Sequence, residues 1–217
     1  MATPHAERHF LPAAGRDLFL PLYDPFTRLA GVDGLRRLLL EQAALRPAIR
    51  VLDVGCGTGT LAIMAKLAQP SAEVSGLDAD PEMLKVAKYK STLQKVPVNF
   101  DLGFTNHLPY PDQHFDRVLS SIMIHHLKTP DKWQTAKEVY RVLKPGGQLH
   151  IIDFGKPVTS YGKMLGPLLH EFEEANDNID GKLPEIFGSP GLKTEVVGNF
   201  WTFFGDQAFL RGEKPLT

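Results

Sequence analysis

The stretch from Ile49 to Thr60, IRVLDVGCGTGT, constrains the fold of this chain more than any other segment. An apolar run containing a single acid, Asp53, leads directly into glycines that alternate with other residues: Gly55, Gly57 and Gly59. Residues 61–67 then have the composition of a helix. The pattern predicts a buried strand, a glycine-rich turn and a helix, and a turn of this kind usually lies beneath a bound ligand.

Predicted strands and helices alternate along the rest of the chain. We expect helices near 17–29 and 32–45, then strands at 49–54, 73–78, 97–102, 115–121 and 148–154, separated by helices at 59–68, 81–94 and 131–143. Lys144–Gly147 reads as a helix stop and turn. A helix near 160–176, a short helix and a final hairpin turning at Gly198-Asn199 complete the prediction. Such alternation is typical of a parallel, doubly wound α/β sheet.

Composition narrows the classes of protein that fit. The 217 residues carry 24 Lys and Arg against 25 Asp and Glu, a net charge of −1, which gives no electrostatic case for a nucleic-acid partner or an anionic membrane. One cysteine, Cys56, cannot form an internal disulfide, as expected of a cytoplasmic protein. We found no apolar run long enough to cross a bilayer, so we expect no stable membrane insertion.

Two ligands commonly occupy such a turn, a dinucleotide and S-adenosylmethionine. A dinucleotide site has the spacing G-x-G-x-x-G, whereas Thr60 stands where that pattern requires its third glycine. Asp53 would repel a pyrophosphate, but it could order the loop or hold an ammonium group through water. Asp78, at the end of the second strand, could accept both ribose hydroxyls of either ligand. The turn therefore suits a ligand with a cationic amino-acid end.

Four motifs occur in order: VLDVGCGTG, GLDADPEML, LPYPDQHFDRVLSS and RVLKPGGQLHIIDF. Over about residues 35–155 they resemble the class I S-adenosylmethionine-dependent methyltransferases, and most closely the group similar to ubiquinone/menaquinone biosynthesis C-methyltransferases. The resemblance implies a Rossmann-like, doubly wound seven-stranded sheet of order 3-2-1-4-5-7-6 with the last strand antiparallel. It also implies one methyltransferase domain over 1–217, with a helical lid at 1–48, a cofactor core at 49–155 and a substrate-side helix and hairpin at 156–217.

The resemblance implies a set of cofactor-binding residues for S-adenosylmethionine and its product S-adenosylhomocysteine. The glycine loop would lie beneath the methionine part, beside Asp53, and Asp78 would bind the ribose. Phe104 stands where the family often has an acid for the adenine amino group, so adenine would stack on Phe104 or bond to backbone around Thr105 and to Asn106. The full expected set is Asp53, Gly55, Cys56, Gly57, Gly59, Asp78, Ala79, Met83, Phe104, Thr105 and Ser120, with Met83 equally suited to the core.

Methyl transfer needs a general base only when the acceptor loses a proton. His125 and His126 follow the fourth strand at the carboxyl edge of the sheet, where ligands of open α/β sheets bind, and they are the first candidates. The alternative to a role as base is that one of the two histidines packs against the sheet or caps the following turn. Tyr23 either closes over the methyl donor or anchors the lid. No metal-ligand spacing is present, so we expect no metal.

The sequence therefore predicts S-adenosylmethionine-dependent methylation of a small molecule. A binding protein that keeps the cofactor site without transferase activity is the alternative, and Phe104 is the feature that favours it. A dehydrogenase is opposed by the glycine spacing and by Asp53. The acceptor atom is left open, because carbon, oxygen and nitrogen methyltransferases share this cofactor half. A homodimer is also left open.

Overall fold

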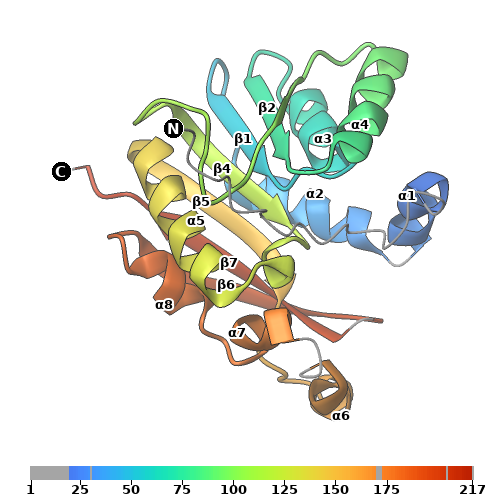
Figure 1. The fold of residues 1–217 in the computed structure, drawn as a ribbon, viewed down its shortest axis with the longest axis vertical. Coiled ribbons are helices and arrows are strands. Elements are labelled where there is room, and N and C mark those ends of the chain that lie inside the picture. Colours follow the sequence, from blue (N-terminus) through green and yellow to red (C-terminus); the bar gives the residue numbers. More distant parts are fainter. Residues whose placement is uncertain (1–19, 30, 170–172, 204, 217) are drawn as a thin grey trace, which may run out of the picture.

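One seven-stranded sheet organises the molecule (Figure 1). The computed structural model describes residues 20–29, 31–169, 173–203 and 205–216. The strand order is β3-β2-β1-β4-β5-β7-β6, as the sequence predicts. The strands are β1 (Arg50–Val54), β2 (Glu73–Asp78), β3 (Asn99–Leu102), β4 (Phe115–Ser121), β5 (Leu143–Phe154), β6 (Lys193–Thr202) and β7 (Gly205–Glu213).

The first five strands are parallel, and β7 runs antiparallel between β5 and β6. Because parallel neighbours end at the same side, the residues following β1, β2 and β4 meet at one edge of the sheet. The turn between β6 and β7 lies at this same edge, since Phe154 at the end of β5 pairs with Gln207. This edge is where a ligand site is expected.

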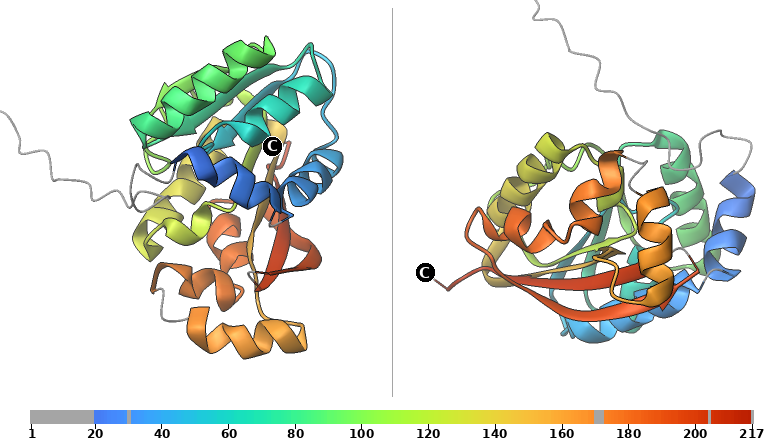
Figure 2. Two further views of the ribbon diagram at one scale, coloured as in Figure 1. Left: turned by 90° about the vertical axis from the view of Figure 1, so that its right-hand side faces the viewer. Right: turned by 90° about the horizontal axis from the view of Figure 1, so that it is seen from below.

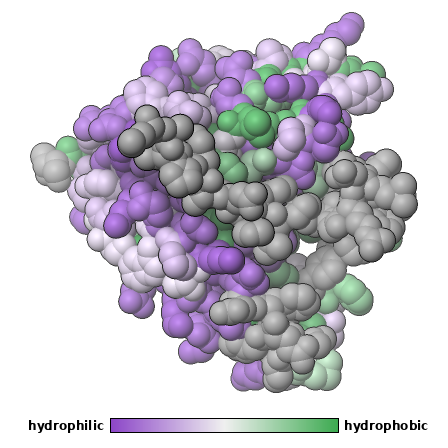
Figure 3. Space-filling model, in the orientation of Figure 1, coloured by the Kyte–Doolittle hydropathy of each residue, from purple (hydrophilic) through white to green (hydrophobic). Residues whose placement is uncertain are grey.

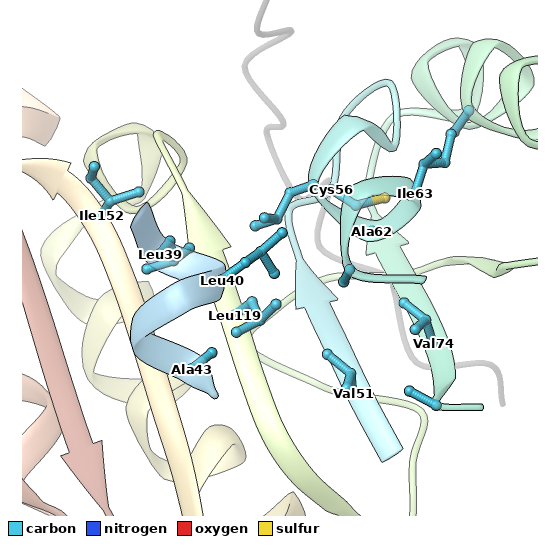
Figure 4. Close-up of a cluster of buried hydrophobic side chains, with 14 of the residues drawn as sticks. Leu39, Leu40, Ala43, Val51, Cys56, Ala62, Ile63, Val74, Leu119 and Ile152 are labelled. Atoms are coloured by element: carbon cyan, nitrogen blue, oxygen red, sulfur yellow. The ribbon is translucent and has the colours of Figure 1, made fainter. Parts of the chain in front are cut away.

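Helices cover both faces of the sheet (Figure 2). Buried side chains of α2 (Val32–Ala43), α3 (Thr60–Ala68) and α4 (Pro81–Gln94) form one core cluster with one face of the sheet (Figure 4). On the other face, α5 (Thr129–Val142) and α8 (Leu183–Gly188) form a second cluster with Phe115 and Leu149. Each fully buried Leu or Phe contributes roughly 1.5–3 kcal/mol of transfer free energy.

The remaining helical elements lie toward the carboxyl edge or beside it. They are α1 (Leu20–Leu29), η2 (Ile124–His126), α6 (Ser160–Leu169), η3 (Glu173–Ala175) and α7 (Asn176–Ile179). No helix in the described part of the chain is long and apolar enough to span a membrane. The face seen in Figure 3 is largely hydrophilic, with its apolar residues in separate small areas.

Local sequence explains the best-predicted elements. Helix α4 begins at Pro81, which has the backbone angle of a first helical turn, and Asp80 caps it by accepting from the N–H groups of Glu82 at 2.8 Å and Met83 at 3.4 Å. The predicted bounds of β2, β4 and α4 match the structure residue for residue.

Two predicted turns differ from the structure. The β6–β7 turn follows Thr202 rather than lying at Gly198-Asn199, because a bulge between Val196 and Gly198 keeps that glycine inside β6. Helix α5 ends just before Lys144–Gly147, as predicted, but these four residues lie within the bounds of β5. They bulge from the ladder, because Phe115 pairs with Leu143 whereas Arg117 pairs with Gln148. Pro145 has no N–H to donate to a regular ladder.

His150 is a buried titratable group in the middle of β5. Its side chain is fully enclosed, its Nδ1 lies 3.2 Å from Oε1 of Gln42, and its Nε2 has no hydrogen-bond partner in the described chain. Burial lowers the pKa of His150 to about 3, with the charges of Arg117 and Arg211 acting in the same direction. The imidazole is therefore neutral in the folded protein at neutral pH.

We predict that His150 makes folding stability fall in mild acid. Between its ordinary pKa and the native value, the unfolded chain binds a proton that the folded chain does not, so the free energy of unfolding decreases as pH decreases. The slope is roughly 1.4 kcal/mol per pH unit once the unfolded histidine is protonated. When the pH is lowered from 7 to 5, the free energy of unfolding should therefore fall by about 2 kcal/mol more in the wild type than in His150→Leu. Urea unfolding at both pH values measures this. The exposed control His107→Leu should keep the wild-type loss, and an equal loss in His150→Leu would contradict the prediction.

Candidate active site

The glycine turn after β1 is held against the end of β2. The N–H groups of Gly55 and Cys56 donate to the carbonyl oxygen of Leu77 at 2.8 and 3.0 Å, and that of Gly59 donates to Cys56 O at 2.9 Å. The φ angles of Gly55, Gly57 and Gly59 are +67°, +52° and +75°, a region that L side chains rarely adopt. The turn therefore requires glycine for its backbone shape.

The three glycines differ in what surrounds them. A Cβ on Gly55 would overlap the side chain of Met123, and one on Gly59 would lie 2.7 Å from Cζ of Phe100. A Cβ on Gly57 would have nothing within 4 Å. The lack of a side chain at Gly55 and Gly59 thus leaves room for Met123 and Phe100, whereas Gly57 faces open space that a ligand can fill.

Two carboxylates stand beside this loop. Asp78 Oδ2 accepts from Gly57 N at 2.7 Å and its Oδ1 accepts from Asp80 N at 2.9 Å, so it fixes the loop directly; burial raises its pKa. Asp53 is 1% exposed, and its Oδ2 has no partner in the described chain. Burial raises the pKa of Asp53 to about 7; the charge of Arg36 opposes this shift and that of Asp78 adds to it.

Several other residues of the expected cofactor set are wholly or partly buried against neighbouring protein atoms. Cys56 packs in the core cluster beneath α3, and burial raises the pKa of its thiol. Met83 is 1% exposed in the first turn of α4, and Ala79 is half-buried after β2. Ser120, fully buried, donates from its hydroxyl to Val54 O at 3.3 Å.

The segment after β3 forms a small bridged turn between Phe104 and His107. Phe104 is half-buried, and Thr105 is buried with its hydroxyl 2.8 Å from that of Thr135 in α5. Asn106 donates from Nδ2 to Asp131 at 2.6 Å, while its buried Oδ1 has no partner in the described chain. Among these residues, Asn106 offers an unpaired acceptor.

The loop after β4 is strained and held by one carboxylate. Ile122 has φ +53°, an outlier for a β-branched residue, and such strain often occurs at functional sites. Asp153, at the end of β5 and fully buried, accepts from the N–H groups of Met123 at 3.0 Å and His125 at 3.3 Å through Oδ2. Its Oδ1 accepts from Phe154 N at 2.7 Å and lies 2.7 Å from Nδ1 of His125.

The two histidines of this loop have different surroundings. Their ring centroids are 4.0 Å apart, and the ring of Phe154 stands edge-on to His125 at 4.7 Å. His125 is 12% exposed and paired with Asp153, whereas His126 is exposed. Desolvation and the charge of His125 lower the pKa of His126. Burial alone would raise the pKa of Asp153, but the charge of His125 and its hydrogen bond hold it below its usual range.

Helix α1, part of the segment expected to form a lid, reaches the glycine loop through Asp24. Its Oδ1 accepts from the hydroxyls of Thr58 at 2.6 Å and Thr60 at 3.2 Å, and its Oδ2 accepts from Lys90 Nζ at 2.6 Å. Burial alone would raise the pKa of Asp24, but the hydrogen bond from Lys90 keeps it low. No local pattern pointed to Lys90, which is 66 residues from Asp24. The side chain of Tyr23 lies outside the described residues.

Comparison with known proteins identifies the family. A family model described as a methyltransferase domain matches residues 51–147. The demethylmenaquinone methyltransferase of Lactobacillus johnsonii is 36% identical over 210 residues, covering 83% of this chain and 85% of that protein. The Deinococcus radiodurans protein of the same name is 37% identical over 142 residues, covering 64% of this chain and 58% of its own length.

Two further matches concern the methylated atom and the cofactor. A ubiquinone/menaquinone biosynthesis C-methyltransferase of Geotalea daltonii is 32% identical over 147 residues, covering 65% of this chain and 62% of that protein. A Haemonchus contortus phosphoethanolamine N-methyltransferase, solved with S-adenosyl-L-methionine, has a TM-score of 0.77 at 18% identity, covering 94% of this chain and 59% of that one. With its fold and its glycine loop, the chain belongs to the S-adenosylmethionine-dependent methyltransferases, in the group that includes the demethylmenaquinone methyltransferases.

Proposed function

We propose that this protein methylates a ring carbon of a small quinol, using S-adenosylmethionine. The single observation that carries the proposal is the buried Asp153 carboxylate holding Nδ1 of His125 at the carboxyl edge of the sheet, next to the glycine loop. The names of the relatives, which include demethylmenaquinone methyltransferases and a C-methyltransferase, support the acceptor class. The cytoplasmic location and the absence of a nucleic-acid acceptor stay predictions, and a homodimer stays open.

The residues at the loop fit the cofactor. Open space above Gly57 admits a ligand against the backbone, and the unpaired Oδ2 of Asp53 suits an ammonium group, directly or through water. Asp78 has lone pairs left for ribose hydroxyls after its two bonds to the loop. S-adenosylmethionine supplies an electrophilic methyl group on a positively charged sulfur.

His125 is positioned to hold a proton. With Nδ1–H donating to Asp153, the lone pair of His125 is at Nε2, and the carboxylate stabilises the imidazolium that forms when Nε2 accepts a proton. Removing a hydroxyl proton from a quinol increases the electron density of its ring carbons, and the ring carbon must lose its own proton after methylation. His126, whose pKa is lowered, stays neutral and offers a hydrogen bond beside the first ring.

Methylation of a soluble quinol tests the proposal. Purified protein, S-adenosylmethionine and 1,4-dihydroxynaphthalene kept reduced under argon should yield S-adenosylhomocysteine and a ring-methylated product, identified by mass spectrometry and NMR. A product methylated at oxygen would contradict the carbon assignment. Binding of S-adenosylmethionine without any turnover of this quinol would contradict the acceptor class.

We predict that Gly57→Ala and Gly59→Ala separate ligand binding from folding. Both put an L side chain at positive φ, a cost of roughly 1–2 kcal/mol each. Gly57→Ala should therefore fold with a modest loss of stability, but its Cβ enters the ligand space and should weaken S-adenosylmethionine binding at least about tenfold by calorimetry. Gly59→Ala should lose more stability, because its Cβ also meets Phe100. Undiminished cofactor affinity in Gly57→Ala would show that the space above the loop is not the cofactor site.

We predict that Asp153 and His125 act as one unit. Asp153→Asn loses the carboxylate that stabilises the His125 imidazolium, and His125→Gln removes the base, so each should lower kcat by on the order of 10²–10⁴-fold. The double variant should be no slower than the slower of the two single variants, because residues acting together are non-additive. Steady-state kinetics with the quinol and calorimetry with S-adenosylmethionine measure this, with the exposed His107→Gln as the control. Multiplying effects in the double variant would contradict a shared role.

A further inference from the structure

Asn178 in α7 has a buried side-chain amide with no hydrogen-bond partner in the described chain. Its side chain is 1% exposed, and neither Nδ2 nor Oδ1 has a hydrogen-bond partner in the described chain. Leaving buried polar groups unpaired costs about 1–3 kcal/mol each, and more than nine in ten such groups in proteins are satisfied. A polar group of a bound ligand would satisfy this amide, which no described residue pairs with.

The orientation of α7 is fixed from the start of α5. Asp177 Oδ2 accepts from the hydroxyl of Thr129 at 2.6 Å and lies 3.5 Å from Nζ of Lys132, which is fully buried. Lys132 also donates to the carbonyl oxygen of Glu174 in η3. With Asp177 facing α5, the next residue lies about 100° further round the helix axis. The burial of Asn178 shows that this direction is inward rather than toward solvent.

Helix α7 adjoins the loop that carries the two histidines. Helix α7 packs against η2, which carries His125 and His126, and against the end of β5 and α6. Ala175 and Ile179, the buried apolar neighbours of Asn178, belong to neither of the two core clusters. Asn178 thus lies outside the two core clusters, on a helix that packs against the histidine loop, β5 and α6. The charge of Glu174 in η3 also acts on the pKa of His126, which places this segment close to the histidines.

We infer that the Asn178 amide binds the oxygen of the methyl acceptor and selects oxygenated rings. This inference rests on the proposed function, since it concerns the acceptor of the same site. A phenolic or quinol oxygen both accepts from N–H and donates from O–H, and a primary amide supplies the matching acceptor and donor. Bound in this way, the ring hydroxyl would be held between α7 and the loop that carries the proton-accepting His125. A ring without oxygen leaves both amide groups unpaired and is disfavoured.

Asn178→Leu separates this role from a structural one. Leucine has nearly the same size and no polar atom, so it removes two unsatisfied groups and should leave the unfolding free energy unchanged or increase it. The variant should bind 1,4-dihydroxynaphthalene about 10- to 100-fold more weakly than the wild type in calorimetry with saturating S-adenosylhomocysteine. Its affinity for naphthalene, which has no oxygen, should be unchanged or higher. Asp180→Asn, an exposed change at the end of the same helix, is the matched control and should bind both compounds as the wild type does.

The outcomes separate this inference from the proposed function. Equal quinol affinity in the wild type and in a folded Asn178→Leu overturns the inference alone, and would mean that a buried water satisfies the amide. A parallel loss of affinity for the quinol and for naphthalene also overturns it, because that pattern indicates a change in pocket shape. Quinol binding that depends on Asn178, without methyl transfer, overturns the proposed function and supports the inference. Failure of the wild type to bind the quinol overturns both.

Discussion

The buried carboxylate of Asp153 is the interaction on which the rest of the site depends. It closes the end of β5 onto the loop after β4 by accepting from two loop N–H groups, from its own neighbour Phe154 and from the ring of His125. A fully buried charge is stable only with such a complement of donors, because desolvation otherwise favours its neutral form. The same bonds hold the loop in which Ile122 has a strained backbone. The burial of the Asp153 charge, the strain at Ile122 and the orientation of the His125 ring therefore depend on one another.

The two sides of the edge, the glycine loop and the proposed acceptor side, are built by different means. The glycine loop is fixed largely by backbone bonds to Leu77 and by Asp78, all from β1, β2 and their turns. The acceptor side is fixed by side chains from separate elements, with Asp153 from β5 and Lys132 from α5. Backbone-built geometry survives many substitutions, whereas side-chain networks change with each one. This difference agrees with a fold whose cofactor half serves many acceptors.

The same distinction explains what the sequence could predict. Alternating β and α segments, the proline and aspartate at the start of α4 and the glycine turn are local signals, so the doubly wound sheet and the glycine loop could be predicted from them. The strand order came from the resemblance of four motifs to a known family. Gly198-Asn199 carries a turn signal, but the aromatic residues after it continue β6 and a bulge absorbs the glycine. The bond of Asp24 to Lys90 and the enclosure of Asn178 depend on packing between elements far apart in sequence, for which no local pattern exists.

Met123 joins the two sides. Its backbone N–H is held by Asp153, and its side chain lies against Gly55 in the space that a Cβ would need. A ligand that shifts this side chain from one side also changes the wall presented to the other. Thermodynamic linkage then requires reciprocity: the factor by which the cofactor alters affinity for the acceptor equals the factor by which the acceptor alters affinity for the cofactor. Because Gly55 has no side chain, the methionine lies directly on it, and a ligand that moved this contact would couple binding on the two sides.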